Sequence, residues 1–77
     1  MLVTKKVIQY VQKNFNEDAQ ASALEWVTLY GNKPEEPDAE AVRLAILKLA
    51  EGNLEQLKTY VRMAKEDYEQ VMTAAGC

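Results

Sequence analysis

The chain has 77 residues, of which 48% are hydrophobic and 27% are charged, and its net charge at pH 7 is −3. This apolar content predicts a single folded domain over residues 1–77 and excludes a disordered chain, while the length leaves no room for a second core. There is no histidine and only one cysteine, Cys77, which excludes a disulfide within these residues and any histidine-based catalysis.

The first 15 residues, MLVTKKVIQYVQKNF, predict a helix near residues 4–15 that Thr4 caps. Its apolar face consists of Val7, Ile8, Val11 and Phe15. The segment lacks a signal-peptide pattern, and no run of 18 apolar residues occurs in the chain, so we expect a cytoplasmic protein outside the membrane. An organellar transit peptide is disfavoured because the segment has neither arginine nor serine.

A second helix is predicted near residues 17–30, separated from the first by Asn16 and ended by Gly31. One face of it carries Ala19, Ala23, Trp26, Val27 and Tyr30. Because the two alanines are small, they allow a neighbouring helix to approach closely.

The acidic stretch PEEPDAE, residues 34–40, follows this helix. Its four carboxylates, Glu35, Glu36, Asp38 and Glu40, could bind a hard cation. The spacing and the glycine of an EF-hand are missing, however, and acids before a helix are favoured by its dipole. We therefore expect a solvated helix start and no metal site.

A third helix is predicted near residues 38–51, with Asp38 as its N-cap after Pro37. Its core stripe consists of Val42, Ala45, Ile46 and Leu49. Leu44 and Leu47 fall on the opposite side, among charged residues, so the helix is apolar nearly all round. Such a helix either lies at the centre of the fold or faces a partner.

The stretch LAEGNLEQL, residues 49–57, predicts a sharp corner between two helices. Gly52 can adopt the left-handed conformation that ends a helix, and Asn53 can cap the next one, with Gln56 completing a capping box. With almost no loop between them, the two helices should fold back as an antiparallel pair.

The last and longest helix is predicted near residues 54–75. One apolar stripe runs along it, formed by Leu54, Leu57, Val61, Ala64, Tyr68, Val71 and Ala75. The stripe could pack on the other helices of the same chain or form an intermolecular coiled coil, and we favour the first. Spacings of three and four residues predict the ion pairs Glu55–Lys58 and Lys65–Glu69.

Together these segments predict an all-α fold, a small antiparallel bundle of about four helices. The stretch RLAILKLAEGNLEQLKTYVRMAKEDYEQVM, residues 43–72, resembles small uncharacterised bacterial helical proteins. Those proteins have no assigned activity, so the resemblance implies only a bacterial, cytoplasmic protein.

The sequence predicts no catalytic, cofactor-binding or metal-binding residue and therefore no enzyme. The five large polar-tipped aromatics, Tyr10, Trp26, Tyr30, Tyr60 and Tyr68, could line a ligand pocket, but most fit predicted core stripes. The first 15 residues carry three lysines beside a strongly acidic segment, which is too weak a cationic footprint for nucleic acid.

We expect a non-enzymatic protein-interaction module or a small homo-oligomeric helical protein, with a homodimer as the first hypothesis. Its candidate surface consists of Leu44 and Leu47, with a contribution from Tyr60. The alternative for the two leucines is a monomer in which the first helix covers them. The alternative function is binding of a small ligand or cofactor in the bundle core.

Overall fold

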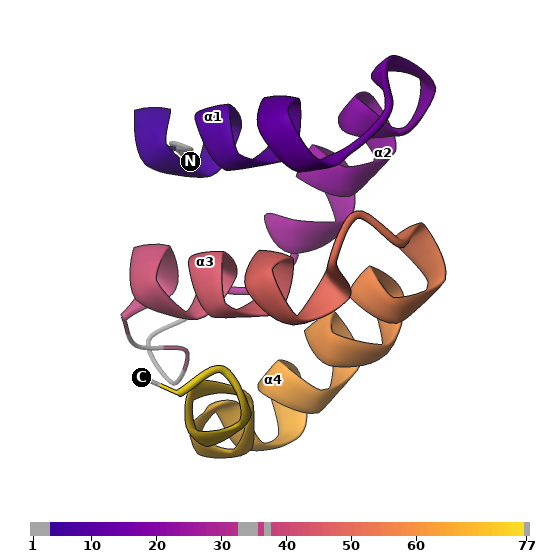
Figure 1. Cartoon of the computed structure of the whole chain (residues 1–77). Helices are drawn as coiled ribbons and strands as arrows, with labels where there is room; N and C mark the ends of the chain where they lie inside the picture. Colours follow the sequence, from indigo (N-terminus) through magenta and orange to yellow (C-terminus); the bar gives the residue numbers. More distant parts are fainter. Residues whose placement is uncertain (1–3, 33–35, 37, 77) are drawn as a thin grey trace.

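The computed structural model describes residues 4–32, 36 and 38–76, so Cys77 and Pro37 lie outside the described part. The described residues form four helices and no strand: α1 (Lys5–Asn14), α2 (Glu17–Val27), α3 (Ala39–Ala50) and α4 (Leu54–Ala74). Figure 1 shows them as a small bundle. The all-α fold with its longest helix at the C-terminal end is confirmed.

The helix α3 is the central element of the bundle. It packs against α1, α2 and α4, and its contact with α4 is the most extensive in the molecule. In Figure 1, α1 lies on one side of α3 and runs in the same direction, whereas α4 returns along the other side. The radius of gyration is 11.0 Å, close to the value of about 11.5 Å expected for one domain of this length.

All four helices contribute to one core. Its buried residues are Val7, Val11, Phe15, Ala23, Val27, Tyr30, Val42, Ala45, Ile46, Leu47, Ala50, Leu57, Val61, Ala64, Val71 and Ala75. The predicted stripes account for most of them, but Leu47 was expected on the surface and is fully buried. The reason is that α3 is surrounded by three helices, so a side chain outside its main stripe is also covered.

The corner between α3 and α4 forms at the predicted residues, but only half of the predicted capping box does, because the amide of Asn53 donates to the carbonyl oxygen of Ala50 at 2.9 Å. Gly52 is left-handed, with φ 77°, and the side chain of Asn53 accepts a hydrogen bond of 3.1 Å from the amide of Gln56. A Cβ atom on Gly52 would overlap the carbonyl oxygen of Asn14 at the end of α1. Glycine is therefore required here both by its φ angle and by the close approach of α1.

The two other predicted N-caps have different outcomes. At the start of α1, the hydroxyl of Thr4 accepts from the amide of Val7 at 3.5 Å, as predicted. Asp38 makes no side-chain cap bond to α3, so that prediction is wrong. Its backbone is left-handed, with φ 53°, whereas a capping side chain reaches the first turn from an extended backbone.

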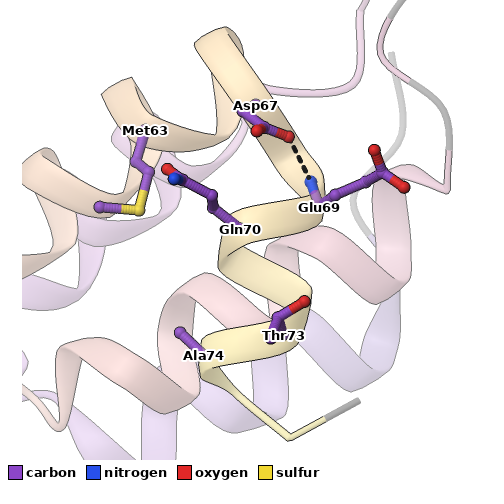
Figure 2. A pocket seen from close by; sticks show the side chains of 6 residues that line it. All are labelled: Met63, Asp67, Glu69, Gln70, Thr73 and Ala74. Atoms are coloured by element: carbon purple, nitrogen blue, oxygen red, sulfur yellow. Dashed lines mark hydrogen bonds between the residues drawn. The ribbon is translucent and has the colours of Figure 1, made fainter.

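The helix α4 is interrupted at Asp67, whose backbone is extended, with φ −157° and ψ 89°. Figure 2 shows the side chain of Asp67 turned toward Glu69, whose amide donates to it at 3.2 Å. Asp67 thus caps the second half of the helix. The predicted pair Glu55–Lys58 forms at 3.5 Å, but Lys65 pairs with Glu36 instead of Glu69.

Candidate functional site

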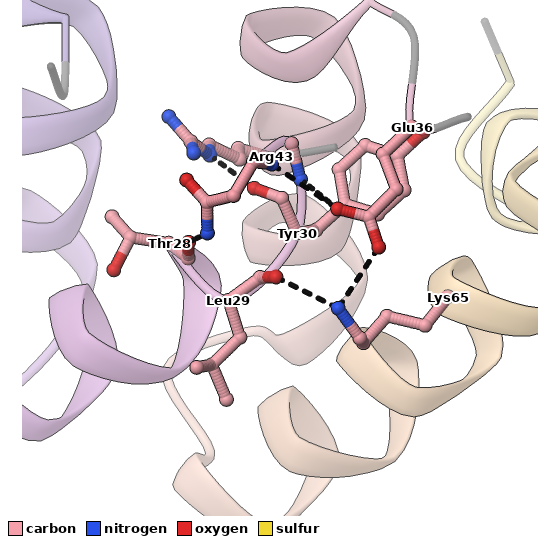
Figure 3. Close-up of polar contacts among 8 residues, drawn as sticks. Thr28, Leu29, Tyr30, Glu36, Arg43 and Lys65 are labelled. Atoms are coloured by element: carbon pink, nitrogen blue, oxygen red, sulfur yellow. Dashed lines mark hydrogen bonds and ion pairs between the residues drawn. The ribbon is translucent and has the colours of Figure 1, made fainter. Parts of the chain in front are cut away.

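Within the acidic segment the expectation of a solvated helix start fails for Glu36, which is only 8% exposed, whereas Asp38 at the start of α3 is exposed. The Oε1 atom of Glu36 accepts hydrogen bonds from the amides of Gly31 at 2.8 Å and Asn32 at 3.1 Å. Its Oε2 atom accepts from Lys65 Nζ at 2.9 Å (Figure 3). The carboxylate therefore links Gly31 and Asn32, in the turn that follows α2, to α4.

One further cation, Arg43, completes this polar cluster, which we call the Glu36 clamp (Glu36, Lys65, Arg43, and the backbone of residues 29–32). Arg43 is 3% exposed and donates from Nε to the carbonyl oxygen of Tyr30 at 2.9 Å. Lys65 also donates to the carbonyl oxygen of Leu29 at 2.9 Å (Figure 3). The clamp thus binds the α2–α3 connection to both α3 and α4.

Burial and hydrogen bonding set the ionisation of these groups. Burial opposes the charge of Glu36, but the hydrogen bonds from Lys65, Gly31 and Asn32 outweigh it and hold its pKa below the ordinary value. Burial, followed by the charge of Glu36, raises the pKa of Tyr30 to about 12. Burial also lowers the pKa of Arg43. Among the described residues no group of three or more histidines, cysteines or acids could hold a metal ion.

A hollow of about 500 Å³ lies beside the interruption of α4. All six residues that line it belong to α4 (Figure 2): Met63, Asp67, Glu69, Gln70, Thr73 and Ala74. A single helix cannot surround a ligand, and binding sites are concave surfaces shared by several elements. We therefore do not regard this hollow as the functional site.

A second concave surface lies between α1, α3 and the end of α4, where two hollows of about 260 and 330 Å³ adjoin. They share Tyr10 and Leu44. We call this surface the Leu44 groove, and its lining residues are Lys6, Gln9, Tyr10, Lys13, Ala41, Leu44, Ala45, Lys48 and Met72. Three helices thus contribute to one open, mostly apolar surface.

Helical spacing explains how these side chains meet. On α1, Lys6, Tyr10 and Lys13 follow one another at steps of four and three residues, so they lie in one row. On α3, Leu44 stands between Ala41 and Ala45, whose short side chains leave the space open. The third wall is Met72, close to the last turn of α4.

That last turn is fixed by Lys48, which donates from Nζ to the carbonyl oxygen of Ala75 at 3.0 Å. A cation at the C-terminal end of a helix satisfies an unpaired carbonyl and interacts favourably with the helix dipole. Lys48 therefore does two things: it lines the groove, and it holds α4 against α3 beside Met72.

The charges around the groove are all positive. Three of its lining residues are lysines and none is an acid. Within residues 4–32, 36 and 38–76, neither Lys6 nor Lys13 takes part in an ion pair. The groove thus combines an apolar floor with a basic rim, in a chain whose net charge is −3.

Of the three candidate residues from the sequence, only Leu44 lies in the groove. Leu47 belongs to the core, which corrects the expectation of two exposed leucines, and Tyr60 is half-buried on α4 outside the groove. Tyr10, Met72 and the lysine rim were missed. The row formed by Lys6, Tyr10 and Lys13 was a usable signal, whereas nothing local indicated Met72.

The aromatic residues do not gather into a pocket, because Tyr10 is the only one of the five that lines either of the two adjoining hollows. Trp26 is half-buried beneath two cations of α4, Lys58 at 5.3 Å and Arg62 at 6.0 Å from its ring centre. Such cation–π contacts stabilise the packing of α2 on α4.

Comparisons of the chain with protein-family models, curated proteins and solved structures find no match. None of the described helices is long and apolar enough to cross a membrane. Function is therefore inferred from the chain's own surfaces.

Proposed function

We propose that the protein is a non-enzymatic protein-interaction module and that the Leu44 groove is its binding surface. The observation that supports this is an apolar floor that stays open between three helices and carries a basic rim. Among the described residues, Leu29 is the only large hydrophobic side chain classed as exposed, and every buried side-chain nitrogen or oxygen has a hydrogen-bond partner. Apolar grooves between helices commonly bind helical segments of other proteins.

Binding of a small ligand inside the bundle is less well supported. The core positions are occupied by side chains that are 0 to 5% exposed, and the hollows described above open to the surface. The most apolar of them, at about 330 Å³, is near the lower limit of about 300 Å³ for ligand pockets.

The homodimer hypothesis is weakened by the position of Leu47 in the core. A two-fold dimer formed through the Leu44 groove would place Lys6 and Lys13 of both copies at one interface, and like charges oppose each other there. We therefore propose a different protein as the partner.

Site-specific photo-crosslinking tests this proposal. A small diazirine amino acid is placed at Ala41 in the groove or, as a control, at Gln70 in the hollow of α4; both positions are exposed. We expect an adduct of defined mass with another protein from Ala41 only, and its loss when Leu44→Asn is added. Equal adducts from Gln70, or adducts that persist with Leu44→Asn, would contradict the proposal. A crosslink between two copies would restore the homodimer.

A further inference from the structure

We propose that the occupant of the Leu44 groove is an amphipathic helix that carries acidic residues beside its apolar face. This inference rests on the proposed function, since it assumes that the groove binds a protein. It adds the chemistry of the partner, which follows from the shape and the charge of the groove.

The shape of the groove suits two turns of a helix. The row on α1 runs from Lys6 to Lys13, a span of seven helical steps that corresponds to about 10 Å along the helix axis. The facing row on α3, from Ala41 to Lys48, has the same length. An incoming helix could lie along these two rows with apolar side chains at steps of three, four and seven residues. Those side chains would contact Tyr10 of the α1 row and Leu44 of the α3 row.

The charge of the groove selects an acidic partner. Lys6 and Lys13 are exposed and, within the described residues, have no acidic partner, so they are available to carboxylates at the edge of a bound helix. Each exposed ion pair contributes modestly, and together the rim lysines should favour an acidic over a neutral helix by roughly tenfold. Such a preference should weaken in high salt.

A binding assay with three helical peptides tests the inference. The peptides share one apolar face of leucines and are stapled as helices, and their flanking positions carry glutamate, glutamine or lysine. Dissociation constants are measured by fluorescence anisotropy at low and high salt, and amide shifts of Tyr10, Leu44 and Ala45 locate the site by NMR. We expect the glutamate peptide to bind about tenfold more tightly than the glutamine peptide at low salt, and about equally at high salt.

Neighbouring lysines on α1 provide a matched control. Lys6→Gln and Lys13→Gln should each reduce the preference for glutamate. Lys5→Gln makes the same change of charge one residue from Lys6, but Lys5 does not line the groove, so the preference should persist. Equal effects of Lys5→Gln and Lys6→Gln would overturn the inference, because the attraction would then be non-specific.

The outcomes separate the two proposals. If the glutamate and glutamine peptides bind equally at low salt and Leu44→Asn weakens both, the groove binds helices but the acidic partner is wrong. If the glutamate peptide binds more weakly than about 1 mM, the helical occupant is wrong as well. A single-stranded oligonucleotide and decanoate test two other anionic occupants. If either binds the groove more tightly than the glutamate peptide, the proposed acidic helix is wrong.

Discussion

The Glu36 clamp and the Leu44 groove both contain lysines, but they place them in opposite environments. In the clamp, Lys65 donates to a carboxylate and to a backbone carbonyl, and the carboxylate is buried. In the groove, Lys6 and Lys13 stand beside an apolar floor without an acidic partner among the described residues. The paired charges of the clamp hold the fold together, whereas the unpaired lysines around the groove are the basis for proposing an acidic partner there.

The largest expected loss of stability comes from a core leucine of α3, and a groove leucine on the same helix provides the comparison. Leu47→Ala removes a fully buried side chain and should lower the free energy of unfolding by about 3 kcal/mol, whereas Leu44→Ala should cost about 1 kcal/mol or less because Leu44 is already half-exposed. Urea unfolding followed by circular dichroism measures both. Equal losses would mean that Leu44 is also core and that the groove is closed.

The clamp should be the next most sensitive region. Glu36→Gln removes the charge that accepts from Lys65 and from two backbone amides, and should cost about 2 kcal/mol. The figure is below that of a fully buried pair because the side chain of Lys65 is 37% exposed. Glu25→Gln, at an exposed position of α2, is the control and should change stability by less than about 0.5 kcal/mol.

The same carboxylate should make stability depend on pH. The pKa of Glu36 in the folded chain lies below its ordinary value of 4.5, so its contribution is complete above about pH 4.5 and is lost as the pH falls through the lowered folded pKa. The difference in stability between the wild type and Glu36→Gln should therefore shrink on acidification. A difference that stays constant from pH 7 to pH 3 would show that Glu36 does not act through its charge.

Local rules were sufficient to locate the four helices and the corner between α3 and α4, but not the end of α2 at Val27 or the interruption of α4 at Asp67. Gly52 and Asn53 act through their own backbone and side-chain geometry, which a short window of sequence contains. The burial of Leu47 depends instead on how many helices surround α3. No periodicity within α3 reports that number, so the sequence left open whether its second apolar side was core or interface, and the interface was preferred.

Contacts between distant residues explain why the ion pair of Lys65 and most of the groove were not predicted. Lys65 was assigned to Glu69 by helical spacing, but it bonds to Glu36, 29 residues away, in a buried environment where a charged hydrogen bond is worth more. The extended backbone at Asp67 separates Lys65 from Glu69, so their helical spacing no longer applies. For the groove, the sequence indicated Leu44, but the approach of Tyr10 and Met72 follows only from tertiary packing.

The smallest effects on stability are expected from the lysines of the groove, which can be compared with Lys65 of the clamp. Lys65→Gln leaves Glu36 buried without its cation and should cost about 1 kcal/mol. Lys6→Gln and Lys13→Gln should each change stability by less than about 0.5 kcal/mol, since no bond within the described chain is lost. The effect of Lys48→Gln should fall between these values, because Lys48 lines the groove and also bonds to the end of α4.

Thermal unfolding of the four variants measures this order. A loss at Lys6 or Lys13 as large as at Lys65 would show that the rim serves the fold, and would remove the reason to expect an acidic partner.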